Sequence, residues 1–382
     1  MTLNKIFFIY LSGFLLAVHY ASVAYVNSSL LTQFVQNKTL GILYIVGSIL
    51  SLISLVLAPS FLRKIGNKKT LLIFILLEIF AVLGMGSFEA ALLIIFLFLL
   101  HQAAESMLYF SLDIELEEQT KIESATGSKR GIFLTTQNIA WVLSPFAISF
   151  LISGNNLENA YFLSGLALMP LFLIALLFFK KIKNAEARNT HFLSALSALY
   201  KEKDKAKIVG AQFVLNFFFS WMIIYLPLLL NEIGFGWDKI GLLLTIMLLP
   251  YLFFELPAGI LADRKFGEKE ALILGFLIMV FSTAVIPFLQ TPVFWIWAVI
   301  LFATRIGASL VEISSESYFF KHVKEIDTGA ISLFRMARPF SFILAPLLSI
   351  PILYFTGYSG SFLFLALATA SGLFFLPKKD TR

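Results

Sequence analysis

Long apolar runs alternate with short polar turns along the whole chain. A helix of about 20 apolar residues is long enough to cross the hydrocarbon core of a bilayer. The pattern therefore predicts twelve membrane-spanning helices joined by short connections. They are expected at residues 5–26, 39–62, 70–87, 90–112, 131–152, 159–179, 207–230, 239–261, 269–289, 292–320, 329–354 and 359–377.

The predicted helices form two similar sets about 200 residues apart. In each set a tyrosine precedes a Leu/Ile-Gly-Leu/Ile-Leu segment by sixteen residues, and a charged turn with a second glycine follows. The matched residues are Tyr25 and Tyr225, Gly41 and Gly241, and Gly66 and Gly267. A duplicated set of hydrophobic helices is typical of a secondary transporter, in which two halves rock about a site at the bilayer midplane.

Composition excludes a soluble protein. Hydrophobic residues make up 59% of the 382 residues and charged residues 14%, and the mean hydropathy is +0.88. The first apolar run resembles a signal peptide, with Lys5 before it and Ser22-Val23-Ala24 near its end. We interpret it as a retained helix, because it is long enough to span and because Tyr25 has its counterpart in Tyr225.

Positive charge is distributed unequally between the two ends of the predicted helices. Of the 29 lysines and arginines, 24 lie on the side of the N-terminus and two, Lys38 and Lys239, on the other. This bias predicts a multi-pass protein of the cytoplasmic (inner) membrane with both termini cytoplasmic. The net charge of +6 is explained by topology, and no basic patch with stacking aromatic residues indicates nucleic acid.

The longest polar stretch separates the two halves. We expect an N-terminal six-helix bundle at 1–180, a cytoplasmic linker at 181–206 and a C-terminal six-helix bundle at 207–382. Apolar residues from Phe192 to Tyr200 recur at helical spacing in the linker, which predicts an interfacial amphipathic helix serving as a tether.

The motifs of enzymes, pumps and metal sites are missing. The chain has no cysteine, and its four histidines, His19, His101, His191 and His322, lack the spacing of metal-binding motifs. Neither a GxSxG nucleophile motif nor a phosphate-binding glycine loop occurs. We therefore expect no enzyme activity, no cofactor and no metal.

The turn after the eighth predicted helix reads Gly259-Ile-Leu-Ala-Asp263-Arg264-Lys-Phe-Gly267 and continues Glu-Lys. This turn resembles the GxLaDRxG signature of the major facilitator superfamily, with one extra residue between Arg264 and Gly267. The resemblance implies a conformational latch formed by Gly259, Asp263, Arg264 and Gly267. In the first half Arg63 replaces the aspartate, which leaves the function of the N-terminal latch open.

The same resemblance implies an all-α membrane protein of twelve transmembrane helices in two pseudo-symmetric six-helix bundles. The substrate path is then expected between helices one, four, seven and ten. Residues Leu301 to Ser309 look like a partial version of the arginine motif that the family usually carries in helix four. In this chain the arginine, Arg305, lies in helix ten, and His101 takes the place in helix four.

Ionisable residues inside predicted helices are functional candidates, because a charge at mid-membrane costs several kcal/mol unless it faces a partner or a wet cavity. His101 and Glu105 are four residues apart on one helix face, and such a pair can exchange a proton near physiological pH. The substrate or coupling candidates are His101, Glu105, Arg305, Glu312, Arg338, Glu255, His19 and Asn216. Two readings compete with this one: arginines 335 and 338 pair with the glutamates of other helices, and His19 is a core residue. Glu78 is interpreted only as a partner for a neighbouring helix.

The sequence thus predicts a secondary active transporter that moves a small organic solute by alternating access, with proton-coupled export (antiport) as the expected mode. Proton-coupled import (symport) of an anionic or zwitterionic metabolite is the alternative, and a non-transporting sensor or scaffold is a third. The three intramembrane arginines favour an anionic or zwitterionic solute over a lipophilic cation. The expected partners are the solute, protons and membrane lipids, and the chain is expected to be a monomer.

Overall fold

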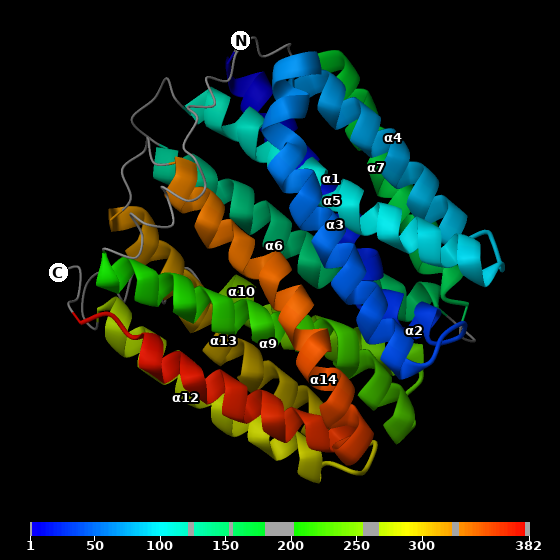
Figure 1. Ribbon diagram of the computed structural model, residues 1–382, viewed down its shortest axis with the longest axis vertical. Coiled ribbons are helices and arrows are strands. Elements are labelled where there is room, and N and C mark those ends of the chain that lie inside the picture. Colours follow the sequence, from blue (N-terminus) through cyan, green and yellow to red (C-terminus); the bar gives the residue numbers. More distant parts are fainter. Residues whose placement is uncertain are drawn as a thin grey trace. The chain divides into compact units, whose positions relative to one another are not determined.

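The computed structural model describes residues 2–120, 126–152, 156–179, 202–254, 267–322 and 328–378. Every regular element within these ranges is a helix (Figure 1). The fold is that of an all-α membrane protein. The chain divides into two compact units, Met1–Ala187 with Gly236–Leu242, and Arg188–Phe235 with Leu243–Arg382. Each unit is described by itself.

In the described part of the first unit, α1 to α7 follow one another along the chain, and α1, α4, α5 and α7 position the site. α1 packs against α6, α7 and α5, while α4 packs against α5 and α7. The helices are α1 (Thr2–Ala24), α2 (Asn27–Leu31), α3 (Asn37–Ile65), α4 (Asn67–Met85), α5 (Ala91–Thr120), α6 (Thr126–Leu151) and α7 (Glu158–Phe178). The chain turns at Tyr25 and Val26 and continues as the short helix α2, which the apolar pattern did not predict.

In the second unit, α9 packs against α13 and α14, and α12 packs against the same two helices. Its elements are α9 (Lys203–Ile233), the part of α10 (Trp237–Phe253) that follows Leu242, α12 (Glu268–Val285), η2 (Ile286–Phe288), α13 (Phe294–His322), α14 (Thr328–Ala370) and η3 (Ser371–Phe375). α14 covers both of the last two predicted spans, and Gly357, with φ 64° and ψ −175°, interrupts it between them.

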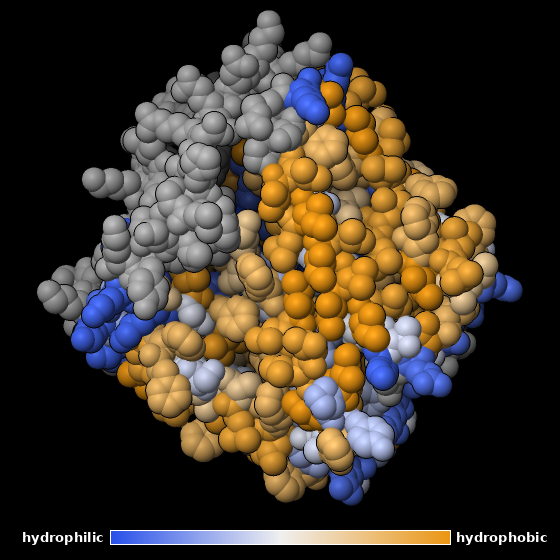
Figure 2. Space-filling model, in the orientation of Figure 1, coloured by the Kyte–Doolittle hydropathy of each residue, from blue (hydrophilic) through white to orange (hydrophobic). Residues whose placement is uncertain are grey.

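Many large apolar side chains lie on the outer surface, and several polar and charged side chains are buried. Nine helical segments within the described ranges are long and apolar enough to cross a membrane, with α14 and η3 forming one of them. Large apolar side chains such as Leu92 (84% exposed) and Trp295 (71% exposed) cover the outside. Figure 2 shows apolar side chains over much of the coloured part of the face in view. This distribution is typical of a protein whose surroundings are lipid.

The two register-matched turns have the same backbone conformation. Gly66 has φ 81° and ψ 157° before α4, and Gly267 has φ 81° and ψ 159° before α12. This region of backbone space is accessible essentially only to glycine. The duplication found in the sequence is thus present in the local geometry of both helix starts.

Replacing Gly66 with alanine is expected to destabilise the protein by about 1–3 kcal/mol, the usual cost of a side chain held in this backbone region. The measurement is the thermal unfolding midpoint of the purified protein in detergent. Ser87→Ala, at an exposed position after α4, serves as the control. An unchanged midpoint in Gly66→Ala would show that the turn can adopt another conformation without loss.

Part of the sequence interpretation lies outside the described residues. Of the predicted latch, Gly259, Asp263 and Arg264 are not described, and Glu255 is not described either. The proposed linker helix also lies there, and only residues 202–206 of the expected linker are described, with α9 beginning at Lys203. The domain boundaries at 180 and 207 stay predictions.

Candidate functional site

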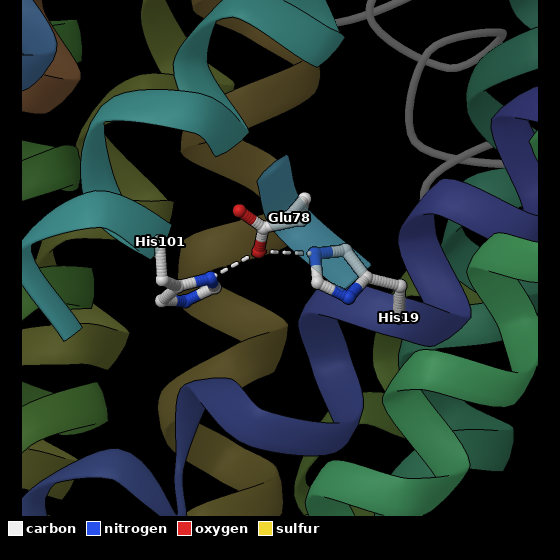
Figure 3. A group of neighbouring side chains, drawn as sticks. All are labelled: His19, Glu78 and His101. Atoms are coloured by element: carbon white, nitrogen blue, oxygen red, sulfur yellow. Dashed lines mark hydrogen bonds and ion pairs between the residues drawn. The ribbon is translucent and has the colours of Figure 1, made fainter. Parts of the chain in front are cut away.

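Three helices of the first unit each bring one titratable side chain to the same place. His19 lies on α1, Glu78 on α4 and His101 on α5, and at most 1% of each is exposed. Figure 3 shows Glu78 between the two imidazole rings. We refer to His19, Glu78 and His101 as the histidine–glutamate cluster. A carboxyl group at this depth in an apolar helix bundle requires compensation by its neighbours.

One carboxylate oxygen contacts both histidines. Glu78 Oε1 is 3.0 Å from His19 Nε2, and the same oxygen is hydrogen-bonded to His101 Nδ1. The two imidazole rings lie 5.8 Å apart at an angle of 82°. The second carboxylate oxygen, Oε2, is buried and has no hydrogen-bond partner among the described residues. Glu78 can therefore accept a proton on an oxygen that makes no competing contact.

A second layer of buried polar groups holds the far side of each ring. His19 Nδ1 is 2.6 Å from Ser164 Oγ, and His101 Nε2 is 3.5 Å from the amide nitrogen of Asn27. The Tyr161 hydroxyl donates a hydrogen bond of 2.8 Å to the amide oxygen of Asn27. Such contacts orient an imidazole and select its tautomer.

These partners define a consistent set of proton positions. If Glu78 is ionised and both histidines are neutral, His101 donates its Nδ1–H to the carboxylate, and His19 places Nε2 3.0 Å from the same oxygen. Each ring then accepts at its other nitrogen. Asn27 directs its amide nitrogen to His101 Nε2 and its amide oxygen to the Tyr161 hydroxyl. Ser164 supplies its O–H to His19. A hydroxyl can donate or accept, so an additional proton on His19 Nδ1 is accommodated by Ser164.

The histidine–glutamate cluster also has the donor types of a metal site. One nitrogen from each ring and a carboxylate oxygen lie within 4.8 Å of one another, and two histidines with a glutamate can bind zinc. However, Glu78 Oε1 touches both ring nitrogens directly, as expected when protons lie between these atoms. The arrangement fits shared protons better than a metal ion.

The sequence candidates of the first unit are brought together, with one addition. His19 and His101 belong to the histidine–glutamate cluster, and Glu105 is buried one turn from His101 on α5. His19 was also interpreted as a core residue, and Glu78 only as a pairing partner. The signal that could have found Glu78 is its position near the middle of an apolar helix, in the same membrane layer as both histidines.

The candidates of the second unit are arranged differently. Arg305 on α13 is 2% exposed, and its guanidinium lies over the rings of Phe218 and Phe219, at 5.4 and 4.9 Å. Asn216 is buried and donates a hydrogen bond to the backbone oxygen of Gln212 on its own helix. Glu312 and Arg338 are partly exposed, and their role as solute ligands stays a prediction.

The sequence repeat relates the two arrangements. The offset of 200 residues between the tyrosines matches His19 with Phe219, and the offset of 204 between Leu97 and Leu301 matches His101 with Arg305. The offset of 201 between Gly66 and Gly267 matches Glu78 with Met279. In both units the helix-one residue therefore lies beside the helix-four equivalent, as His19 beside His101 and Phe219 beside Arg305.

Comparison with known proteins agrees with the architecture. The family model described as Major Facilitator Superfamily matches residues 6–239 and, separately, 208–382. A comparison with curated proteins gave no match.

Solved structures with the same fold include several transporters. A point mutant of the nucleoside transporter NupG has a TM-score of 0.78 at 15% identity, and the match covers 97% of this chain and 98% of that one. A POT family transporter in complex with a thioalcohol-conjugated peptide gives 0.74 at 13% identity, covering 97% and 95%. The POT family transporter PepTSo gives 0.73 at 12% identity, covering 97% of both chains. At these identities the similarity shows the fold alone.

Proposed function

Because the chain belongs to the Major Facilitator Superfamily, we propose that it couples the movement of a small organic solute to protons through the histidine–glutamate cluster. Membership makes it a multi-pass secondary transporter rather than an enzyme. The observation that supports proton coupling is the buried carboxylate of Glu78 in contact with two imidazoles. Histidine is the side chain best suited to exchange protons near neutral pH.

Protonation can act on the packing of the first unit. The hydrogen bonds of the histidine–glutamate cluster and its second layer join α1, α4, α5, α7 and the short helix α2. A proton on Glu78 removes the charge that holds both rings, and a proton on His19 reverses its bond with Ser164. Either change alters the contacts between helices, and such a difference between two conformations shifts their populations.

We propose antiport, in which protons move in as the solute is exported. We further propose that the transporter is a monomer of the cytoplasmic membrane with both termini on the cytoplasmic side. The opposite assignment is import by symport. The two modes predict opposite directions of solute flux. In antiport an inward proton gradient drives the solute out, and in symport it drives the solute in. The resident cluster serves as the proton carrier in both cases.

The test uses purified full-length protein in liposomes with an imposed pH gradient. Benzyltrimethylammonium, phenylacetate and phenylalanine serve as cationic, anionic and zwitterionic probes of similar size. The flux of a transported probe is expected to follow the gradient and to fall to that of protein-free liposomes when a protonophore collapses it. A carrier-dependent flux that is the same with and without the gradient would contradict proton coupling. The direction of flux distinguishes antiport from symport.

A further inference from the structure

We propose that Tyr161 acts through Asn27 as a positioning residue for proton exchange, by holding the Asn27 amide so that its N–H group faces His101 Nε2. In this orientation the amide opposes protonation of His101 and so sets the pH at which this ring exchanges its proton. The inference rests on the proposed function and deepens it, since it names two residues that regulate the histidine–glutamate cluster without belonging to it.

A chain of hydrogen bonds leads from Tyr161 to Glu78. The Tyr161 hydroxyl on α7 donates to the Asn27 amide oxygen at 2.8 Å, and the Asn27 amide nitrogen lies 3.5 Å from His101 Nε2. On the other side of the ring, His101 Nδ1 is hydrogen-bonded to Glu78 Oε1. Because Nδ1 gives its proton to the carboxylate, Nε2 of the neutral ring is an acceptor, and an amide N–H is a donor that suits it.

The short helix α2 brings Asn27 to this place. The chain turns at Tyr25 and Val26, and Asn27 is the first residue of α2. Asn27 is 2% exposed and Tyr161 is fully buried. At this burial a polar group that loses its hydrogen-bond partner is strongly destabilising. The hydrogen bond between Tyr161 and Asn27 therefore resists rotation of the amide.

Two carboxylates attract a proton to His101, and the N–H group of Asn27 opposes them. Glu78 is in direct contact with the ring, and the charge of Glu105 also acts on it. A hydrogen bond donated to the neutral form of a group disfavours its charged form. A proton on Nε2 would face the N–H of Asn27, and the amide could present its oxygen only by giving up the hydrogen bond that Tyr161 donates. The pair thus allows His101 to release a proton that the carboxylates would otherwise retain.

The ionisable groups around His101 come from several helices and act on the ring directly, across Phe98, or through Tyr161. They are His19 and Tyr20 on α1, Tyr44 on α3, Glu78 on α4, Glu105 on α5 and Glu158 on α7. All of them are retained when Tyr161 or Asn27 is substituted. A change in the proton affinity of His101 in such a variant therefore reports on the Tyr161–Asn27 pair.

Nitrogen-15 NMR of the purified full-length protein, labelled at histidine, tests this role without any solute. His191→Gln and His322→Gln remove the two histidines outside the cluster and give the parent protein, and the signals lost in His101→Gln identify that ring. The shifts of the ring nitrogens separate the neutral tautomers from imidazolium. In the parent we expect His101 to carry its proton on Nδ1 at about pH 8 and to gain a second one on acidification to about pH 5.

Two near-isosteric substitutions should raise the pH at which His101 is half protonated. Tyr161→Phe removes only the hydroxyl, which frees the amide to present its oxygen to Nε2, and a rise of about one pH unit is expected. Asn27→Asp keeps an acceptor for Tyr161 and replaces the N–H group with an oxygen, so the rise should be larger. Tyr225→Phe, the matched control, removes another buried tyrosine hydroxyl, which is hydrogen-bonded to Ser349 in the second unit, and should leave the value unchanged.

An unchanged value in both Tyr161→Phe and Asn27→Asp, or a fall in Asn27→Asp, would overturn the role of this pair. So would a His101 ring that keeps one protonation state between about pH 5 and about pH 8 in the parent. Thermal unfolding identifies a variant that does not fold, and the other variant then decides.

The liposome assay separates this inference from proton coupling. If both hold, the pH dependence of gradient-driven flux shifts with the His101 value in each variant, and counterflow of the same probe persists. A shifted His101 value with unchanged flux would retain the positioning role and reject coupling through His101. Gradient-driven flux with an unshifted His101 value would retain proton coupling and reject the positioning role.

Discussion

Glu78→Gln is expected to reduce gradient-driven transport to the level of protein-free liposomes. The amide resembles the carboxylate in shape, but it neither ionises nor attracts two imidazoles through one charged oxygen, as Glu78 Oε1 does. Exchange of solute down its own gradient needs no net proton movement and should persist. The measurements are flux driven by an imposed pH gradient and counterflow of the same probe in parallel liposomes.

The matched control is Glu89→Gln, which alters a carboxylate in the exposed connection between α4 and α5. It should leave both fluxes unchanged. An infrared difference spectrum between about pH 5 and about pH 8 adds a readout without solute, because a proton exchanged within the histidine–glutamate cluster gives a difference band of its imidazole or carboxylate groups. Persistence of the band and of gradient-driven flux in Glu78→Gln would exclude Glu78 as the coupling residue.

Added zinc or a chelator should leave wild-type flux unchanged, since the cluster is assigned to protons.

Gly307→Val is expected to destabilise the second unit by about 3 kcal/mol or more. A Cβ at Gly307 would lie 2.5 Å from the backbone oxygen of Gly275, and one at Gly275 would lie 2.7 Å from the oxygen of Gly307. The backbones of α12 and α13 meet at these two glycines, and a backbone atom cannot move aside as a side chain can. The measurement is the thermal unfolding midpoint in detergent.

Ala303→Val provides the control, because it adds a β-branched side chain at a partly exposed position one turn earlier on α13. It should shift the midpoint only slightly. A normal midpoint for Gly307→Val would mean that α12 and α13 separate without loss, and would remove the packing explanation for this glycine. Gly307 belongs to the segment that resembled the arginine motif, and the structure gives it a role in helix packing.

The apolar pattern predicted the helices well because the surrounding lipid imposes it on every span. Both expected turns at Gly66 and Gly267 are present, and the boundary between the last two helices lies at the break in α14. The short helix α2 was missed, since it continues the apolar run of α1 and only its backbone turn separates them.

The candidate site was predicted only in part, for a physical reason. Helical spacing shows which residues share a face of one helix, as with His101 and Glu105. It does not show which faces of different helices meet. Glu78 and His19 join His101 through contacts between α1, α4 and α5, and in the sequence Glu78 was an isolated acid. For the same reason the two histidines form no motif in the sequence, because their ring nitrogens come from separate helices.

The repeat has kept its scaffold while its two copies have acquired different electrostatic roles. Where the first copy has His19, Glu78 and His101, the second has Phe219, Met279 and Arg305. The first set can gain or lose charge in the pH range of a cell, and the guanidinium of the second cannot. In the proposed function, the set in the first half exchanges protons, whereas the guanidinium at the matching place of the second half keeps its charge. A chimera built from two copies of the first half would carry two histidine–glutamate clusters and no counterpart of Arg305.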